Sequence, residues 1–75
     1  MDHTFIEGLS VSIVAARKAQ NLRQRDLADL ANVSSRFLSD LENGKATVEL
    51  HKLLQVLHTL GLDLQVVTKT TRGKN

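Results

Sequence analysis

Apolar residues recur at helical spacing along most of the chain. Near the amino end they fall at Phe5, Leu9, Ile13 and Ala16, three or four positions apart. Such spacing places side chains on one face of a helix. The pattern therefore predicts a helix over residues 5–19, and Asn21 suits the left-handed turn that ends it.

Two shorter helices are predicted in the middle of the chain. The first covers residues 24–31 and ends at Asn32. The second covers residues 34–43, with Ser34 as its N-terminal cap, and an Asn-Gly step stops it. The inward positions of this pair of helices are predicted to be Leu27, Ala28, Ala31, Leu38 and Leu41.

The strongest helical pattern covers residues 47–60, with Thr47 as a cap and Gly61 after the last turn. Beyond Gly61 the period changes, because apolar and other residues alternate over residues 62–68. That alternation predicts a strand. The inner face of the fourth helix is predicted to consist of Leu50, Leu53, Leu54, Leu57 and Leu60.

A single strand in a helical chain has no partner for its backbone groups. The simplest solution is antiparallel pairing with the same strand of a second copy about a two-fold axis, through Leu62, Leu64 and Val66. The predicted fold class is mostly α: one domain over residues 1–75, with four helices and a C-terminal strand that pairs across a homodimer. Residues 69–75, which are basic and contain glycine, are expected to form a flexible tail.

Composition excludes several kinds of function. The 75 residues include no cysteine, which removes thiol catalysis, disulfides and cysteine zinc sites, and Phe5 and Phe37 are the only aromatic residues. No apolar run is long enough to span a membrane, so the cytoplasm is the expected compartment. A chain this short buries only about 60% of its unfolded surface, which favours additional burial in a dimer.

Enzymatic chemistry is not expected either. His51 and His58 are seven positions apart and lack the spacing of a zinc-binding helix, so we expect no metal site. No nucleophile–base pair, paired carboxylates or glycine-rich phosphate loop stands in the sequence. The sequence therefore predicts no catalytic residue and no cofactor.

Basic residues are concentrated rather than evenly spread. Residues 17–25 contain four basic and no acidic side chains, and Arg36 and Lys45 follow at intervals. Scattered surface charge would have no functional meaning. If the fold gathers these cations on one side, however, they form the electrostatic footprint of a nucleic-acid-binding protein.

The stretch from Gln24 to Lys45 has the organisation of a helix-turn-helix. Ala28 is small enough to let two helices cross closely, and Val33 is placed to anchor the turn in the core. In such a unit the second helix protrudes, so that its N-terminal residues reach base edges in the major groove.

On these residues the chain resembles the Cro/CI-repressor type (XRE-like) of helix-turn-helix proteins, over about residues 9–68. Within that family it is similar to the HipB-like antitoxin regulators, because the segment TVELHKLLQVLHTLGLDLQV is a fourth helix that ends in Leu-Gly-Leu and runs into a strand. The broader resemblance is carried by Leu22, Gln24, Leu27-Ala28, Val33-Ser34, Leu38-Ser39, Leu41-Glu42 and Asn43-Gly44-Lys45.

The resemblance implies a compact lambda-repressor-like helical domain that binds a pseudo-palindromic operator as a dimer. It places Ser35, Arg36 and Ser39 at base-contacting positions. Gln24 matches a phosphate-contacting position, and Lys45 falls where contacts with the DNA backbone are common.

Two capping positions extend the expected phosphate contacts. Arg23 replaces the Thr or Ser that often caps the second helix, and we expect it to contact a phosphate instead. Ser34 caps the third helix, and such a cap can also contact a phosphate.

The resemblance further implies a nucleoid-associated transcriptional repressor that is the antitoxin and autoregulator of a HipBA-like operon. Its expected partners are double-stranded DNA, a second copy of the chain and a HipA-like serine/threonine kinase toxin. One alternative is a stand-alone phage or host repressor without a toxin. Another is a protein-interaction module that has lost DNA binding, since Ser34, Ser35 and Ser39 are short.

Several side chains have two interpretations. Arg36 would either fork onto a guanine or bind a phosphate, and Arg17 would either bind a phosphate or form an ion pair with Glu42. Phe37 would either meet a thymine methyl or pack along the Leu41 face, and packing is favoured.

The amino-terminal helix carries apolar residues outside its main inner face. Val11 and Val14 lie off that face, and Phe5 and Ile6 belong to a segment ahead of the usual start of the domain. Phe5 and Ile6 would close the core or support the dimer. Alternatively, this surface would dock a cognate protein.

Overall fold

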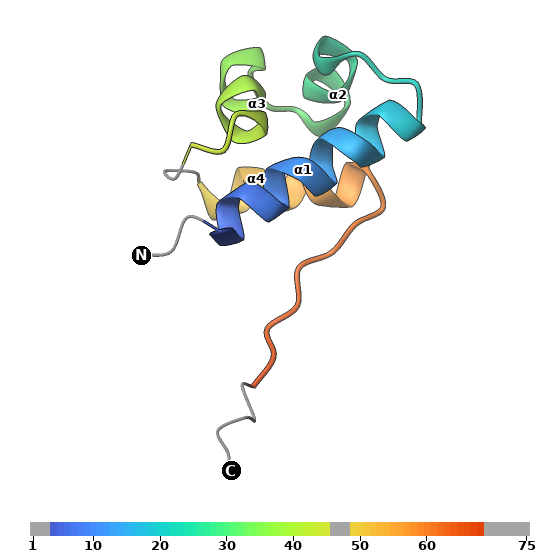
Figure 1. Cartoon of the computed structure of the whole chain (residues 1–75). Helices are drawn as coiled ribbons and strands as arrows, with labels where there is room; N and C mark the ends of the chain where they lie inside the picture. Colours follow the sequence, from blue (N-terminus) through green and yellow to red (C-terminus); the bar gives the residue numbers. More distant parts are fainter. Residues whose placement is uncertain (1–3, 46–48, 69–75) are drawn as a thin grey trace.

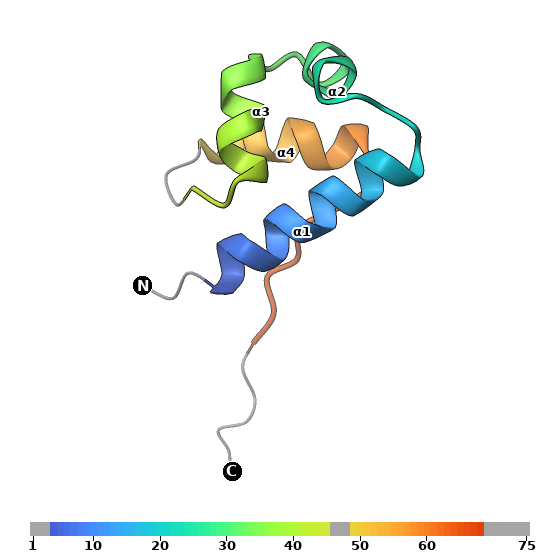
Figure 2. The same ribbon diagram turned by 45° about the horizontal axis from the view of Figure 1, so that its top comes forward.

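A computed structural model describes residues 4–45 and 49–68, which form four helices. Figures 1 and 2 show α2 and α3 on one side of α1 and α4, with the chain after α4 leaving on the opposite side. The four predicted helices are confirmed. Their bounds are α1 Thr4–Ala19, α2 Gln24–Ala31, α3 Ser35–Glu42 and α4 Leu50–Thr59.

The core forms where the helices meet. α2 packs on α3 and α4, and α3 also packs on α1. Each helix contributes apolar side chains to one continuous cluster, which is what holds a small helical domain together. The largest members that are essentially inaccessible to solvent are Ile13, Leu27, Leu38, Leu41, Val56 and Leu57.

The helix ends lie close to where local sequence signals predicted them. Asn21 and Asn32 adopt left-handed backbone angles, with φ of 58° and 59°. Gly61 follows α4 at a φ of 79°, a conformation that side chains disfavour. The Ser34 hydroxyl accepts a hydrogen bond from the Phe37 N–H at 3.0 Å, so the predicted cap of α3 is confirmed.

The start and the inner face of α4 differ from the prediction. The helix begins at Leu50 rather than at residue 47, and the predicted Thr47 cap lies outside the described residues. Leu50 is 59% exposed, whereas Val56, which was not assigned to the inner face, is fully buried. Both sets of positions satisfy the helical period, and packing of α4 into the shared core selects the face that contains Val56.

The buried face of α1 differs from the predicted one mainly in its first turn. Ile13 is buried and Leu9 and Ala16 pack against the core as predicted, but Phe5 is 58% exposed, and Ile6 and Ser10 are buried instead. Ser10 occupies an inner position because its hydroxyl lies 2.9 Å from the Ile6 carbonyl oxygen and 2.7 Å from that of Leu41. Its single proton can be donated to one carbonyl at a time, and either bond satisfies the buried hydroxyl.

No strand is present in the described part of the chain, where residues 62–68 have no regular secondary structure. Leu62 and Leu64 are half-buried against the helical core, while Val66 is 98% exposed. A strand needs a second strand for its backbone hydrogen bonds, and the described residues of one chain supply none. The predicted flexible tail, residues 69–75, lies outside the described residues.

The described helices include none with both the length and the apolar character needed to cross a membrane.

Candidate nucleic-acid interface

A tight turn joins α2 to α3. The N–H of Val33 donates to the Ala28 carbonyl oxygen at 3.0 Å, and Asn32 supplies the left-handed residue that redirects the chain. Val33 packs against the core, and Ala28 is 1% exposed. These contacts hold the two helices at a defined separation, as a helix-turn-helix requires.

The amino end of α3 faces solvent while its inner face is buried. Ser35 and Arg36 are exposed, and Leu38 and Leu41 are fully buried. Ser39 lies one turn further along and is half-buried. Arg36 forms no ion pair with the residues that the structure describes. Its five donors are therefore available to an external acceptor.

Phe37 turns towards the protein rather than away from it. The ring is half-buried and packs against the core cluster, so the interpretation that favoured packing is confirmed. The Nζ atom of Lys52 in α4 lies 5.9 Å from the centre of the ring, within the range of a cation–π contact.

Lys45 lies just beyond the carboxyl end of α3. Its Nζ atom is 3.5 Å from Oδ1 of Asp40, and the Lys45 side chain is 62% exposed. An exposed pair at this distance is weak, so the ammonium remains available to a phosphate. At the same end, the Asn43 amide nitrogen donates to the Ser39 hydroxyl at 3.5 Å, the limit of a hydrogen bond.

Arg23, at the N-cap position of α2, is held by Asp26. The Asp26 carboxylate accepts the Arg23 backbone N–H at 2.9 Å and the Arg23 Nε–H at 3.1 Å. In the first of these bonds the side chain of the third helical residue, Asp26, accepts the backbone N–H of the N-cap residue, Arg23, as in a capping box. Hydrogen bonds from the Arg23 side chain and backbone hold the pKa of the Asp26 carboxyl below its ordinary value. The Arg23 side chain is 74% exposed, so a phosphate would share its guanidinium with Asp26.

Glu42 joins three helices beneath this surface. Its carboxylate accepts hydrogen bonds from Arg17 Nε at 2.8 Å and Arg17 Nη2 at 3.0 Å, and from the Gln24 amide nitrogen at 3.1 Å. Arg17 also donates to the Leu22 carbonyl oxygen at 2.9 Å. Of the two interpretations of Arg17, the ion pair with Glu42 is the one found, so Arg17 belongs to the framework.

Sequence reasoning missed the partners of several polar side chains. It gave Gln24 no partner, although Glu42 orients that amide, and it did not identify Ser10 as a buried contact between α1 and α3. Gln55 in α4 donates to the Ala31 carbonyl oxygen at 2.9 Å and so satisfies the end of α2. The signal in the sequence that could have revealed these hydrogen bonds is the presence of polar residues beside the predicted inner faces.

Comparison with known proteins agrees with this geometry. A family model described as "Helix-turn-helix" matches residues 13–67. The chain is also similar to the "Uncharacterized HTH-type transcriptional regulator y4mF" of Sinorhizobium fredii, with 49% identity over 67 residues, 89% of this chain and 86% of the relative. The chain belongs to the helix-turn-helix family of DNA-binding transcriptional regulators.

The matched residues include both helices that have the geometry of a helix-turn-helix unit, α2 and α3, and the turn between them. Gln24, Arg36 and Lys45 also lie within the match. Regulators of this family act by binding DNA, so this helix-turn-helix protein is not an enzyme.

Proposed function

We propose that this helix-turn-helix protein binds a pseudo-palindromic operator as a homodimer and represses transcription from it. The observation that carries the proposal is the amino end of α3, where Ser35 and Arg36 are exposed above a fully buried Leu38. A helix anchored on one side and exposed at its first turn is the element that enters a major groove.

Base contacts are assigned to Ser35, Arg36 and Ser39. The two serines are short donors that serve several bases, so they discriminate weakly. Arg36 is the long donor of the set, and forked onto a guanine it would contribute roughly 1–3 kcal/mol of discrimination. Sequence preference is therefore expected to rest mainly on Arg36.

Phosphate contacts are assigned to Gln24, Arg23, Ser34 and Lys45. Gln24 and Arg23 stand at the start of α2, and Ser34 and Lys45 stand at the two ends of α3. Contacts at the ends of both helices would fix the protein on the DNA backbone. Lysine and arginine contacts of this kind release counterions, which makes binding strongly dependent on salt.

The dimer is proposed to form by antiparallel pairing of residues 62–68 from two copies, with Leu62, Leu64 and Val66 on the interface side. Support comes from Val66 and Val67, which are 98% and 73% exposed in the single chain. The pairing would satisfy backbone groups that one chain leaves open. It would also set two α3 amino ends about 34–36 Å apart, one turn of DNA.

We propose further that the protein is the antitoxin and autoregulator of a HipBA-like operon and binds a HipA-like serine/threonine kinase toxin. Support comes from the carboxyl end of α4, where Leu60, Gly61 and Leu62 lead out of the helix into an extended segment, as in the HipB-like chains that the sequence resembles. A kinase-toxin gene beside this gene, with binding of the two purified proteins, would support this role. Absence of such a gene would leave a stand-alone repressor.

The test of DNA binding is a gel shift with the region upstream of the gene, followed by titration of Arg36→Ala. We expect this variant to lose about ten-fold or more in affinity for the operator and much less for unrelated DNA, because a lost guanine contact removes discrimination. Lys45→Ala is the matched control, since removal of a phosphate contact weakens binding to all sequences alike.

Two results would contradict the assignments. Equal losses on operator and unrelated DNA would move Arg36 to a phosphate contact. Failure of the wild-type protein to shift any fragment of its own upstream region would favour an interaction module that has lost DNA binding.

A further inference from the structure

The outer face of α1 is unusually apolar for a helix at the surface. Ile6 and Ile13 already supply its buried side, yet Val11 is 69% exposed on the other side. Val14 is half-buried beside it, and Ala15 is exposed. A helix that is apolar on both sides is normally covered on both. The described residues of one chain cover the Ile13 side and leave the Val11 side open.

Four outward positions form a continuous stripe along this face. Glu7, Val11, Val14 and Lys18 are separated by four, three and four residues, which places them in one row on a helix. Glu7 and Lys18 are both exposed, and neither forms an ion pair within the described residues. The row therefore has an acid at one end, two valines in the middle and a base at the other end.

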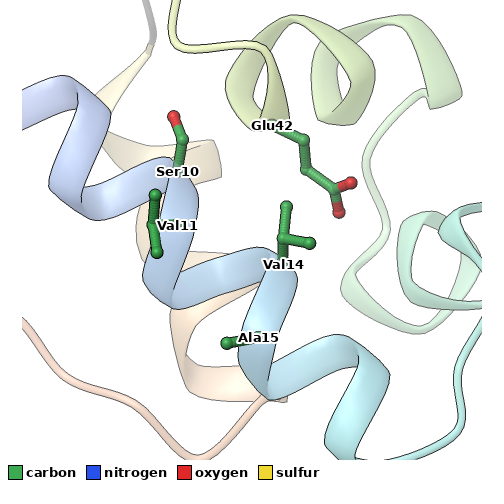
Figure 3. Close-up of a pocket in the computed structure, with 5 residues that line it drawn as sticks. All are labelled: Ser10, Val11, Val14, Ala15 and Glu42. Atoms are coloured by element: carbon green, nitrogen blue, oxygen red, sulfur yellow. The ribbon is translucent and has the colours of Figure 1, made fainter.

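A hollow lies beside the two valines. It has a volume of about 340 Å³ and is lined by Ser10, Val11, Val14, Ala15 and Glu42. Figure 3 shows Glu42 of α3 facing Val14 of α1 across it. Because Arg17 and Gln24 already bind the Glu42 carboxylate, this wall carries little net charge. The hollow suits an apolar side chain rather than a cation.

We infer that this face binds the same face of α1 in a second copy, with the two helices antiparallel. In that arrangement Glu7 lies opposite Lys18 of the second copy, and Val11 lies opposite Val14 of the second copy. Both charge pairs are then attractive, and both valine pairs close over the hollows. When two copies of the row run in opposite directions, each acid lies opposite a base and each valine lies opposite a valine. Such self-complementarity is the property of a two-fold contact between identical chains.

This contact goes beyond the proposed operator-binding dimer. It uses α1, whereas the proposed dimer uses residues 62–68, so one chain has two separate surfaces for copies of itself. The α1 patch is small and is expected to be the weaker of the two. It would join dimers as concentration rises, and on DNA it would link dimers bound at neighbouring operators.

The test is sedimentation velocity of the full chain without DNA, from low to high micromolar concentration. Glu7→Lys and Lys18→Glu are each expected to weaken association of dimers by about ten-fold, because each change turns two attractive pairs into two repulsive ones. The double variant reverses every pair at once. It is expected to return to within about two-fold of the wild type, since both pairs become attractive again.

A second pair of variants tests the valines. Val11→Lys is expected to abolish the association, and Ser12→Lys is the matched control, because Ser12 is exposed on the same helix but outside the row. Circular dichroism checks that all variants keep their helices. Failure of the double charge variant to recover, or equal loss in the Ser12 control, would overturn the inference and leave this face to a different protein. Since no DNA is present, the result does not depend on operator binding.

Discussion

Glu42 is the side chain on which the helix-turn-helix framework most depends. It is 6% exposed and receives three hydrogen bonds, two from Arg17 and one from Gln24. A carboxylate buried to this extent is tolerated only when it is paired. Glu42 therefore ties the proposed phosphate-contacting end of α2 to the helix that is proposed to contact bases.

Glu42→Ala is expected to destabilise the domain by about 3 kcal/mol, because it leaves the Arg17 guanidinium buried without its partner. Urea unfolding followed by circular dichroism measures the loss. The double variant Arg17→Met/Glu42→Leu is expected to be more stable than Glu42→Ala, since an apolar pair removes the uncompensated charge. A loss below about 0.5 kcal/mol for Glu42→Ala would mean that the pair behaves as an exposed one.

The ion pair of Asp26 with Arg23 predicts that the stability of the fold depends on pH. Its folded-state pKa is depressed, chiefly by the Arg23 hydrogen bonds, so the ion pair stabilises the fold above the ordinary pKa of 3.8. That contribution is lost as pH falls through the folded-state value. Asp26→Asn keeps an acceptor for the Arg23 N–H but removes the charge. Its difference in melting temperature from wild type is expected to be present at neutral pH and to shrink as the pH falls below the ordinary carboxyl pKa of 3.8. A constant difference would contradict the assignment.

At the scale of elements, the two ends of α3 perform different tasks. The amino end is capped by the Ser34 hydroxyl and leaves Ser35 and Arg36 exposed. The carboxyl end reaches Glu42, whose partners lie in α1 and α2. One end is thus proposed to contact DNA, while the other fixes the orientation of the helix.

Substitution of Ser34 separates capping from contact with DNA. Ser34→Ala is expected to cost about 1 kcal/mol of stability, because the Phe37 N–H loses its acceptor. Ser34→Asp retains the cap, so stability is expected to stay close to wild type, but the added negative charge should repel phosphate and weaken DNA binding. Chemical denaturation and gel shifts measure the two effects. Unchanged DNA affinity for Ser34→Asp would place Ser34 away from the phosphates.

At the scale of the whole molecule, the chain has more apolar surface than its own fold covers. Phe5, Val11, Leu30 and Val66 are all more than half exposed. Small domains gain little stability from burial alone, so contacts between copies would add a large share of the buried apolar area. The segment after α4 and the outer face of α1 are the two regions where we propose such contacts.

Removal of residues 62–75 is expected to convert the dimer to monomers at low micromolar concentration, because the proposed intersubunit strand is lost. Removal of residues 69–75 alone is the matched control and should leave the dimer intact. Sedimentation equilibrium distinguishes the two masses. A tight dimer after the longer deletion would show that the strand does not hold the copies together.

The candidate site contains side chains whose exposure the sequence predicts and side chains whose hydrogen-bond partners it does not predict. The exposure of Ser35 and Arg36 followed from their place after a capped helix start, because a helix buries one face and exposes the other. The environment of Gln24 did not follow, since its partner Glu42 lies 18 positions away on another helix. Position along a helix is a local property, whereas the partner of a polar side chain is not.

The amino-acid sequence by itself determined where most helices begin and end. Asn21, Ser34 and Gly61 act on their own backbone neighbourhood, so their effects can be predicted without knowledge of the rest of the chain. Periodicity also predicted the buried faces of α2 and α3, whereas only the tertiary structure decided which positions of α1 and α4 are buried. Ser10 lies inside because a carbonyl 31 positions away can accept its proton, and Val56 lies inside because it packs into the core cluster to which all four helices contribute. Burial depends on contacts between distant segments, and periodicity along one helix does not specify those contacts.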